Sequence, residues 1–463
     1  MHGPYDQVNA LVLGAGASGE AAALLLAARG GCVQVLDESD GAACAAVAGR
    51  LREAGIALHF GAGELPDEPF DVCVTSPGFA VRHPWIASCR ARGVTVISEL
   101  ELGACYWPGR ILAVTGSKGK SSLVKLCADT LNGAGVTASP AGNYGIPLSR
   151  LALERPELCW AVTEVSSFQM EHTRTFRPDI AILLNLQADH LDRHADMAEY
   201  KALKLSLFAS MRRGGVALLP AGLSHEGRIP EGVELLRFGT DAGCEWAYAD
   251  HAVMGILGGR VCKVELRGSW FDNAVLGAAA AAGVAALRHA GLNNVQIETG
   301  LTGFEPLAHR MQTVAVSRQG VRYVDDSKAT SLTATAAALR MAQGPVRLIA
   351  GGLLKEKELG WAKELLTQTV KKVYLIGQCA EQMFQAWSTS VPCEVCGTLE
   401  RAVEAVQGEA LPGEVVLLSP GTASFDQFTS YRERGERFTE RVRAVADLDE
   451  RFFSEGKKDK ETQ

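Results

Sequence analysis

Short apolar segments alternate with polar turns and helix-length stretches over most of the chain. This alternation is typical of parallel sheets built from repeated βα units. In the first hundred residues it predicts strands at 10–13, 33–36, 72–75 and 94–97. The turn Gly14 to Gly19 has the spacing G-x-G-x-x-G, and Asp37 follows about 20 residues later, as in Rossmann-like nucleotide-binding domains.

A second glycine turn follows the apolar run Ile111 to Val114. The turn itself is Thr115 to Gly119, and Lys120, Ser121 and Ser122 then open a helix that we expect to run to residue 131. Backbone N–H groups, a lysine and a serine hydroxyl in this order are suited to nucleotide phosphates and their Mg²⁺. The full G-x-x-x-x-G-K-[ST] pattern is not met, because valine occupies the first glycine position, so an ordinary βα turn is the alternative.

Polar residues also end two further strands in this central block. Glu164 closes the apolar segment 158–165, and His190 follows the segment 180–184. A carboxylate in this position is either a solvated edge residue or a metal ligand, and a hard-cation site shared by Glu164, Ser121 and His190 fits a nucleotide Mg²⁺. His190 and His194 share the spacing of a zinc protease motif but lack its glutamate, so we do not expect zinc.

The last third of the chain returns to βα alternation. It predicts strands at 322–324, 347–350, 373–376 and 415–418, each followed by a glycine or hydroxyl cluster. Ligands of open α/β sheets bind at the carboxyl ends of the strands, so these clusters mark the ligand edge. Arg310, just before this block, is a candidate phosphate-binding cation, with a plain surface charge as the alternative.

Composition narrows the class of protein further. The chain has 463 residues, 47% hydrophobic and 21% charged, and a net charge of -7, which argues against a nucleic-acid partner. Cys393 and Cys396 form the only C-x-x-C among twelve cysteines and lack flanking ligand histidines. With no signal peptide and no apolar run of membrane-spanning length, we expect a cytoplasmic protein that does not enter a membrane.

Several motifs in a fixed order give the sequence a family resemblance that runs from about residue 10 to residue 443. The chain resembles the Mur ligases, and among them those that add D-glutamate. The motifs are Thr115 to Ser122, Gly142-Asn143, Glu164 to Gln169, Asp189-His190-Leu-Asp192, Tyr200 with Lys204, His309-Arg310, Asp326 to Thr330, and Leu418 to Phe428.

The resemblance implies an ATP-dependent amide ligase of cytoplasmic peptidoglycan precursor synthesis. Such a ligase joins D-glutamate to UDP-N-acetylmuramoyl-L-alanine through an acyl phosphate, and we expect it to be a monomer. The implied fold is α/β with three domains, which are a Rossmann-like domain for the UDP substrate (1–106), a P-loop ATPase-like domain with a parallel sheet (107–310) and a Rossmann-like domain for D-glutamate (311–463).

The resemblance also implies roles for individual residues. The catalytic group comprises Lys120, Glu164, His190 and Lys204. ATP contacts are Gly116, Ser117, Lys118, Gly119, Lys120, Ser121, Ser122, Asn273, Arg310 and Asp326. UDP-substrate contacts are Gly16, Ala17, Ser18, Asp37, Glu38, Ser76, Pro77, Gly78 and Asn143. D-Glutamate contacts are Lys328, Thr330, Lys355, Ser424 and Tyr431. Two Mg²⁺ ions are held by Ser121, Glu164, His190 and Lys204, the last as a CO₂-derived carbamate.

Three residues depart from the family pattern. Lys118 replaces an asparagine, Trp270 replaces an adenine-contacting asparagine, and Tyr431 replaces a common phenylalanine. The alternatives are another Mur-type ligase or a folylpolyglutamate synthase, which lacks a UDP-type N-terminal domain. From other classes, an NAD(P)-dependent oxidoreductase would use Gly14 to Gly19 with Asp37, and a non-catalytic nucleotide-binding module would follow if the first two departures prevent ATP binding.

Overall fold

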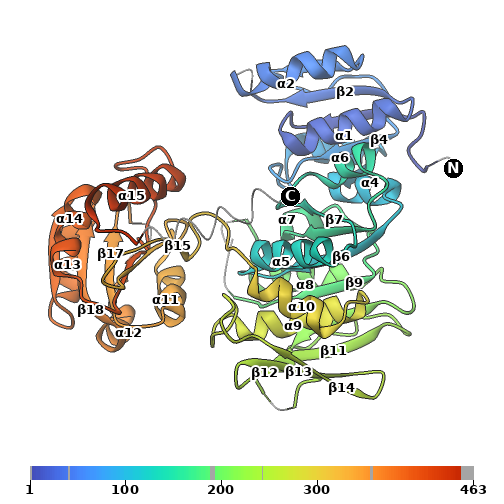
Figure 1. The fold of residues 1–463 in the computed structure, drawn as a ribbon. Helices are drawn as coiled ribbons and strands as arrows, with labels where there is room; N and C mark the ends of the chain where they lie inside the picture. Colours follow the sequence, from blue (N-terminus) through green and yellow to red (C-terminus); the bar gives the residue numbers. More distant parts are fainter. Residues whose placement is uncertain (1–2, 40–41, 188–192, 242, 355–357, 450–463) are drawn as a thin grey trace. The chain divides into compact units, whose positions relative to one another are not determined.

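The computed structural model describes residues 3–449 apart from 40–41, 188–192, 242 and 355–357 (Figure 1). It divides into two compact units, residues 1–272 with 277–304 and residues 305–463 with 273–276. The first unit contains two sheets and the second contains one. The α/β class expected from the alternating pattern is confirmed, because each sheet is built mainly of parallel strands.

The first sheet has five parallel strands in the order β3-β2-β1-β4-β5. Strand β1 lies between β2 and β4, where connections to either side diverge, as in other Rossmann-like sheets. Helices cover both faces, so the central strands β1 and β4 are buried along nearly their whole length. The elements are β1 Asn9–Leu13, α1 Ala17–Ala28, β2 Cys32–Asp37, α2 Ala42–Glu53, β3 Ala57–Phe60, β4 Val72–Thr75, α3 Pro84–Ala91, β5 Thr95–Ser98 and α4 Glu99–Tyr106.

The second sheet has nine strands in the order β14-β13-β12-β11-β10-β9-β6-β8-β7. Strands β6 to β11 are parallel, and β12, β13 and β14 extend them as an antiparallel meander. The elements are β6 Arg110–Thr115, α5 Lys120–Gly133, β7 Ala138–Gly142, α6 Leu148–Glu154, β8 Trp160–Glu164, α7 Ser167–Met170, β9 Ile180–Leu183, α8 Met197–Leu205, η1 Ser206–Phe208, β10 Val216–Pro220, β11 Glu234–Gly239, β12 Trp246–Ala249, β13 Ala252–Leu257, β14 Arg260–Glu265, α9 Gly277–His289 and α10 Asn294–Thr302.

The third sheet has six strands in the order β15-β16-β20-β17-β18-β19, and only the pairing of β15 with β16 is antiparallel. The elements are β15 Gln312–Val316, β16 Arg322–Asp325, α11 Leu332–Met341, β17 Val346–Gly351, η2 Gly360–Ala362, α12 Lys363–Thr369, β18 Val370–Ile376, α13 Ala380–Trp387, β19 Cys393–Gly397, α14 Leu399–Glu409, β20 Val415–Leu418 and α15 Tyr431–Val445.

Buried carboxylates join the first two sheets. The Glu101 carboxylate on α4 accepts hydrogen bonds from the backbone N–H groups of residues 174–176 and from the Thr175 hydroxyl. Two residues earlier, Glu99 accepts a hydrogen bond from the backbone N–H of Ser149 at 2.7 Å, and burial raises the pKa of Glu99 to about 7. Helices α1, α4 and α6 pack side by side there (Figure 1). The two sheets are therefore held by directional bonds as well as by apolar packing.

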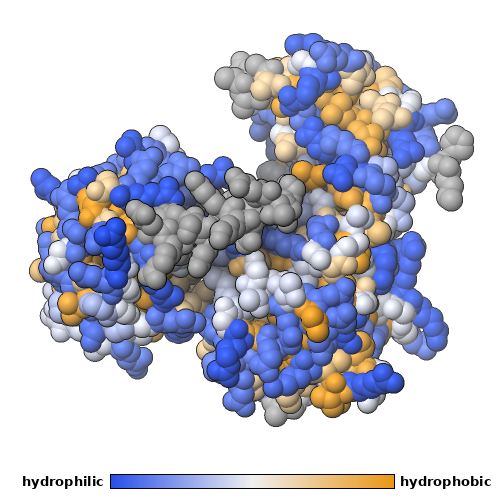
Figure 2. Space-filling model, viewed as in Figure 1, coloured by the Kyte–Doolittle hydropathy of each residue, from blue (hydrophilic) through white to orange (hydrophobic). Residues whose placement is uncertain are grey.

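The face of the molecule seen in Figure 2 is mostly polar. Hydrophilic side chains predominate on the face seen in Figure 2, and apolar ones form smaller groups among them. No helix within the described part of the chain combines the length and apolarity needed to cross a bilayer.

Two helical glycines give a matched test of packing beside the first glycine turn. A Cβ at Gly19 would overlap the carbonyl oxygen of Gly14, whereas a Cβ at Gly49 on α2 would meet no atom within 4 Å. We predict that Gly19→Ala destabilises the first unit by about 3 kcal/mol, because the backbone must shift. Gly49→Ala should stabilise it by up to about 1 kcal/mol through helix propensity. Thermal melting of both variants checks this, and equal melting temperatures would contradict the close packing.

Candidate active site

The phosphate loop lies between β6 and α5. Gly119 takes a left-handed conformation (φ 85°) at the N-cap of α5, so the N–H groups of the first helical turn point toward the loop. The loop is fixed by Asn185, whose Oδ1 accepts the N–H groups of Ser117 at 3.0 Å and Lys118 at 2.9 Å. Ser121 is half-buried on the same turn, and Ser122 is buried behind it. This arrangement is suited to binding phosphate oxygens.

Two lysine side chains converge on this loop from different helices. Lys120 Nζ donates to the carbonyl oxygen of Gly116 at 2.8 Å and to that of Ser117 at 3.0 Å. Lys204, on α8 and only 1% exposed, donates to the same Gly116 oxygen at 2.9 Å. Its ammonium group also lies 4.5 Å from the ring centre of Tyr200. The lysine that the helical pattern alone would leave in solvent is therefore buried in the site.

Glu164 lies beside the phosphate loop, because β8 pairs in register with β6. Its Oε1 accepts a hydrogen bond from the side-chain amide of Asn143 at 2.7 Å. Its Oε2 is buried and has no hydrogen-bond partner among the described residues. An unpartnered carboxylate oxygen beside a phosphate loop fits a hard cation such as Mg²⁺. Asn143, expected to contact the UDP substrate, is thus held at Glu164. His190 lies outside the described residues.

The residues expected to bind the UDP substrate gather at the ends of β1, β2 and β4. A Cβ at Gly14 would lie 2.9 Å from Ser76 Oγ, so the glycine turn and the loop Ser76 to Gly78 are in contact, and this hydroxyl is buried without a described partner. Asp37 Oδ2 accepts a hydrogen bond from the N–H of Ala15 at 2.7 Å, and Glu38 Oε1 lies 3.2 Å from His83 Nε2. Gly16 and Ala17 are exposed, and Ser18 is half-buried at the start of α1.

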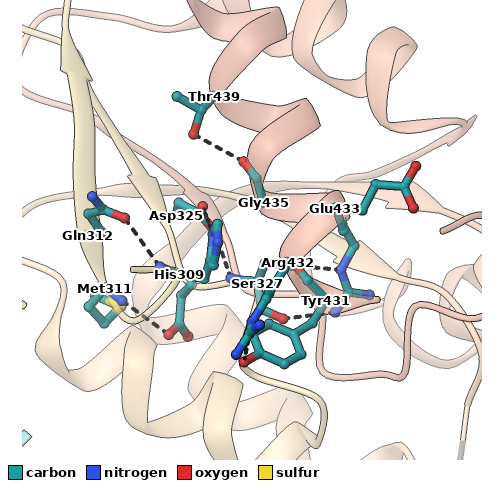
Figure 3. A network of polar contacts seen from close by, with 12 residues as sticks. His309, Met311, Gln312, Asp325, Ser327, Tyr431, Arg432, Glu433, Gly435 and Thr439 are labelled. Carbon is teal, nitrogen blue, oxygen red and sulfur yellow. Dashed lines mark hydrogen bonds and ion pairs between the residues drawn. The ribbon is translucent and has the colours of Figure 1, made fainter. Parts of the chain in front are cut away.

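A polar network occupies the carboxyl edge of the third sheet (Figure 3). His309 Nδ1 lies 2.7 Å from Asp325 Oδ2, and the N–H of Met311 donates to Asp326 at 3.2 Å. Lys328 Nζ lies 3.9 Å from the ring centre of Tyr431. The pKa of Tyr431 is lowered, since Arg432 and Lys328 outweigh the effect of burial. Arg310 is half-buried and close enough to Asp326 to act on its charge.

Arg434 organises this edge and was not anticipated from the sequence. Its buried guanidinium donates to Ser327 Oγ and to the Ser327 carbonyl oxygen, both at 2.9 Å, and to the Thr422 carbonyl oxygen at 3.2 Å. Burial lowers its pKa to about 10. The loop after β16, with half-buried Thr330, is thereby tied to the loop after β20, with buried Ser424. Lys355 lies outside the described residues.

Gly435 was also missed, although a glycine within a helix-forming stretch is a readable signal. A Cβ there would overlap the His309 ring, so α15 can approach His309 this closely only because residue 435 is glycine. Helix α15 therefore supplies the carboxyl edge of the third sheet with the Arg434 guanidinium, and Gly435 lets the helix pack closely against His309.

The predicted adenine-side residues are engaged in local structure. Asn273 Oδ1 accepts the N–H groups of Val275 at 3.1 Å and Leu276 at 3.0 Å. The Trp270 ring packs against Phe271 and Phe304, with centroids 5.0 and 5.4 Å away. Trp270 thus completes an aromatic cluster, which accounts for a large residue at this position.

Asp326 makes the stability of the second unit depend on pH. Burial raises its pKa to about 7, despite hydrogen bonds from Ser419 and Met311. The folded chain therefore holds this proton more tightly than the unfolded chain, and stability falls as pH rises from about 4 to about 7. We predict that Asp326→Asn removes this pH-dependent loss of stability. Its free energy of unfolding should therefore gain on the order of 2 to 4 kcal/mol over the unmodified protein at pH 8, relative to the same comparison at pH 4. Melting temperatures at both values check it.

The matched control is Asp447→Asn, since the Asp447 side chain is 68% exposed. It should leave the pH dependence of melting unchanged. The same dependence in Asp326→Asn as in the unmodified protein would contradict the buried proton.

Comparison with known proteins gives matches over nearly the whole chain. The Mur ligase middle domain matches residues 114–265, and the Mur ligase glutamate ligase domain matches residues 309–421. Similar proteins named UDP-N-acetylmuramoylalanine–D-glutamate ligase occur in Acidobacterium capsulatum (35% identity, covering 94% of this chain and 96% of the relative), Koribacter versatilis (35%, 95% and 98%) and Gloeobacter violaceus (36%, 94% and 99%).

Solved structures share the fold at lower identity. The UDP-N-acetylmuramate-alanine ligase of Thermotoga maritima aligns with a TM-score of 0.57 at 16% identity, covering 94% of this chain and 99% of that one. The MurF ligase of the same organism, solved with ADP, gives 0.56 at 17% (81% and 90%). FolC of E. coli, solved with DHPP and ADP, gives 0.54 at 19% (74% and 90%).

Proposed function

Since this chain belongs to the Mur ligase family, and its full-length relatives are D-glutamate ligases, we propose that it joins D-glutamate to UDP-N-acetylmuramoyl-L-alanine with ATP as the energy source. The observation that carries the proposal is similarity at about 35% identity over nearly the full length of both chains. The same relatives disfavour the oxidoreductase and nucleotide-binding-module alternatives. A folylpolyglutamate synthase is disfavoured by the five-stranded first sheet.

The chemistry begins with a carboxylate that resists attack by an amine. Transfer of the ATP γ-phosphate to the L-alanyl carboxylate gives an acyl phosphate and ADP. Lys120 and the first turn of α5 would bind and orient the phosphates, with Gly116, Ser117, Lys118 and Gly119 as the loop. Bound Mg²⁺ would supply neutralisation of phosphate charge, held by Ser121, Glu164 and His190. The D-glutamate amine then attacks the acyl carbon, and inorganic phosphate leaves.

We propose that Lys204 is carbamylated. Its neutral amine would attack CO₂ to form an N–C bond and release a proton, which turns the side chain into an anion. The support is geometric, because two ammonium groups share the Gly116 carbonyl oxygen and repel each other at a largely buried site. A carbamate would replace this repulsion with attraction and provide oxygens for a second metal ion.

D-Glutamate has two carboxylates and therefore needs cations and hydroxyl groups. We propose that D-glutamate binds at the edge of the third sheet, in contact with Lys328, Thr330, Lys355, Ser424 and Tyr431. We propose that Arg310 and Asp326 contact ATP. The Arg434 contacts described above support this, since they tie the loops carrying Thr330 and Ser424 together.

The organisation of the chain follows from the three sheets. We propose domains at residues 1–106, 107–310 and 311–463, each built on one sheet and serving one reactant. We place the enzyme in the cytoplasm, where its ATP is available, and we propose that it acts as a monomer.

The reaction itself is the first test. We predict that the purified protein releases inorganic phosphate from ATP only when UDP-N-acetylmuramoyl-L-alanine and D-glutamate are both present, because the acyl phosphate needs an acceptor and an amine. Replacing D-glutamate with L-lysine or diaminopimelate should lower the rate at least about 100-fold, because lysine lacks the second carboxylate and diaminopimelate carries its second carboxylate on a longer chain with an added ammonium group. Equal rates with those amino acids would reassign the chain within the family.

The carbamate is tested by substitution. We predict that Lys204→Ala lowers turnover at least about 100-fold, because a buried metal-binding anion is lost. Added acetate or formate should restore part of the rate by filling the space with a carboxylate. Lys201→Ala is the matched control. Lys201 lies on the same helix, but its Nζ pairs with Glu226 Oε1 at a distance of 2.7 Å and not with the phosphate loop. Full activity of Lys204→Ala without added acid would refute the carbamate.

A further inference from the structure

We propose that Arg193 is a positioning residue that holds the acceptor-binding loop in register with the phosphate-transfer site. This inference rests on the proposed function. Arg193 Nη1 donates to the Pro77 carbonyl oxygen and Nη2 to the Phe79 carbonyl oxygen, each at 2.8 Å. These two carbonyls flank Gly78, so one guanidinium brackets the centre of the loop expected to contact the UDP substrate.

The same guanidinium is fixed on its other side by α7. It pairs with Glu171, with Nη2 to Oε2 at 2.8 Å and Nε to Oε1 at 3.3 Å, and it lies 4.1 Å from the ring centre of Phe168. The next residue, His194, is hydrogen-bonded to Ser167 Oγ at 2.9 Å. The segment carrying Arg193 is therefore anchored to the helix that directly follows β8.

Helix α7 begins three residues after Glu164, through a capping box made by Ser166 and Gln169. Arg193 thus links the acceptor loop of the first sheet to the strand whose end carries the proposed metal-binding carboxylate. The loop is also fixed from its own side, because the Phe79 ring stacks on Trp85 with centroids 5.8 Å apart. A short, doubly anchored connection of this kind fixes the distance between two sites.

The contact depends on arginine in particular. Five N–H donors in a planar fork serve a carboxylate and two carbonyl oxygens together, which a lysine ammonium cannot reproduce with the same geometry. The Glu171 side chain is only 5% exposed, so removal of its partner leaves a buried charge uncompensated. Nearby His172 adds no positive charge at pH 7, since burial and the surrounding arginines lower its pKa to about 4.

The functional consequence lies in acceptor placement. Phosphate transfer needs the acceptor carboxylate within near-attack distance of the γ-phosphate, and small misplacements greatly reduce rates. Loss of Arg193 frees the loop at Pro77 and Phe79 while leaving the contacts of Lys120 at the phosphate loop in place. Acceptor binding should therefore weaken selectively.

The test compares Arg193→Ala and Arg193→Lys with the unmodified enzyme. We expect Arg193→Ala to raise the KM for UDP-N-acetylmuramoyl-L-alanine at least about tenfold, as for a lost charged hydrogen bond. The KM values for ATP and D-glutamate should stay within about twofold. Arg193→Lys should retain the charge but restore less than half of the lost affinity, and millimolar guanidinium should partly rescue Arg193→Ala.

Arg110→Ala is the matched control. Arg110 also lies over an aromatic ring, 4.2 Å from Trp160, and pairs with Asp179, yet it touches no part of the acceptor loop. It should leave all three KM values unchanged. An unchanged acceptor KM in Arg193→Ala, or an equal rise in all three constants, would overturn the inference.

Calorimetry separates this inference from the proposed function. Binding of the UDP acceptor to Arg193→Lys and to the unmodified protein is measured without ATP, so the result does not depend on turnover. This measurement does not use Arg193→Ala and therefore remains valid if that variant fails to fold. Weaker binding by Arg193→Lys supports the positioning role, and equal binding refutes it. An unmodified protein that binds the acceptor but releases no phosphate would count against the proposed function alone.

Discussion

Two ammonium groups sharing one carbonyl oxygen set the conditions for the rest of the central site. Lys120 and Lys204 both donate to Gly116, inside a loop whose backbone N–H groups add further positive charge. Such a concentration of positive charge is stable only with anions close by. Triphosphate oxygens, the Glu164 carboxylate and the carbamate that we propose for Lys204 are groups that would balance it, and this is the basis on which we assign an anionic nucleotide to the loop.

Parallel sheets explain why the contacts that we propose for each reactant lie on loops rather than on the strands themselves. Central strands such as β4, β8 and β20 are buried on both faces, so exposed polar side chains gather where these strands end. In the first sheet this edge holds the glycine turn against Ser76, and in the third it holds the His309–Asp325 pair. The same architectural rule therefore underlies the three binding sites that we propose.

The sequence predicted most strands and the placement of polar clusters, because apolar runs followed by glycine or hydroxyl residues are a local signal. Several strands escaped prediction, among them β3, β7, β14, β15 and β19. Strand β7 contains Pro140, which an edge strand tolerates. Local patterns could not reveal that Asn273 bonds within the turn before α9 or that Lys204 is buried. Pairs such as Arg193 with Pro77 join residues far apart in sequence, and only the folded chain brings them together.

The carboxylates between the first two sheets have a consequence for dividing the protein into pieces. A fragment that begins after α4 would remove Glu101 and leave the amide groups of residues 174–176 without the acceptor they share in the whole chain. It would also strip the apolar cover that α4 gives to α6. The smallest piece suited to separate expression is therefore the pair of sheets up to residue 304, even though we propose a separate substrate for each sheet.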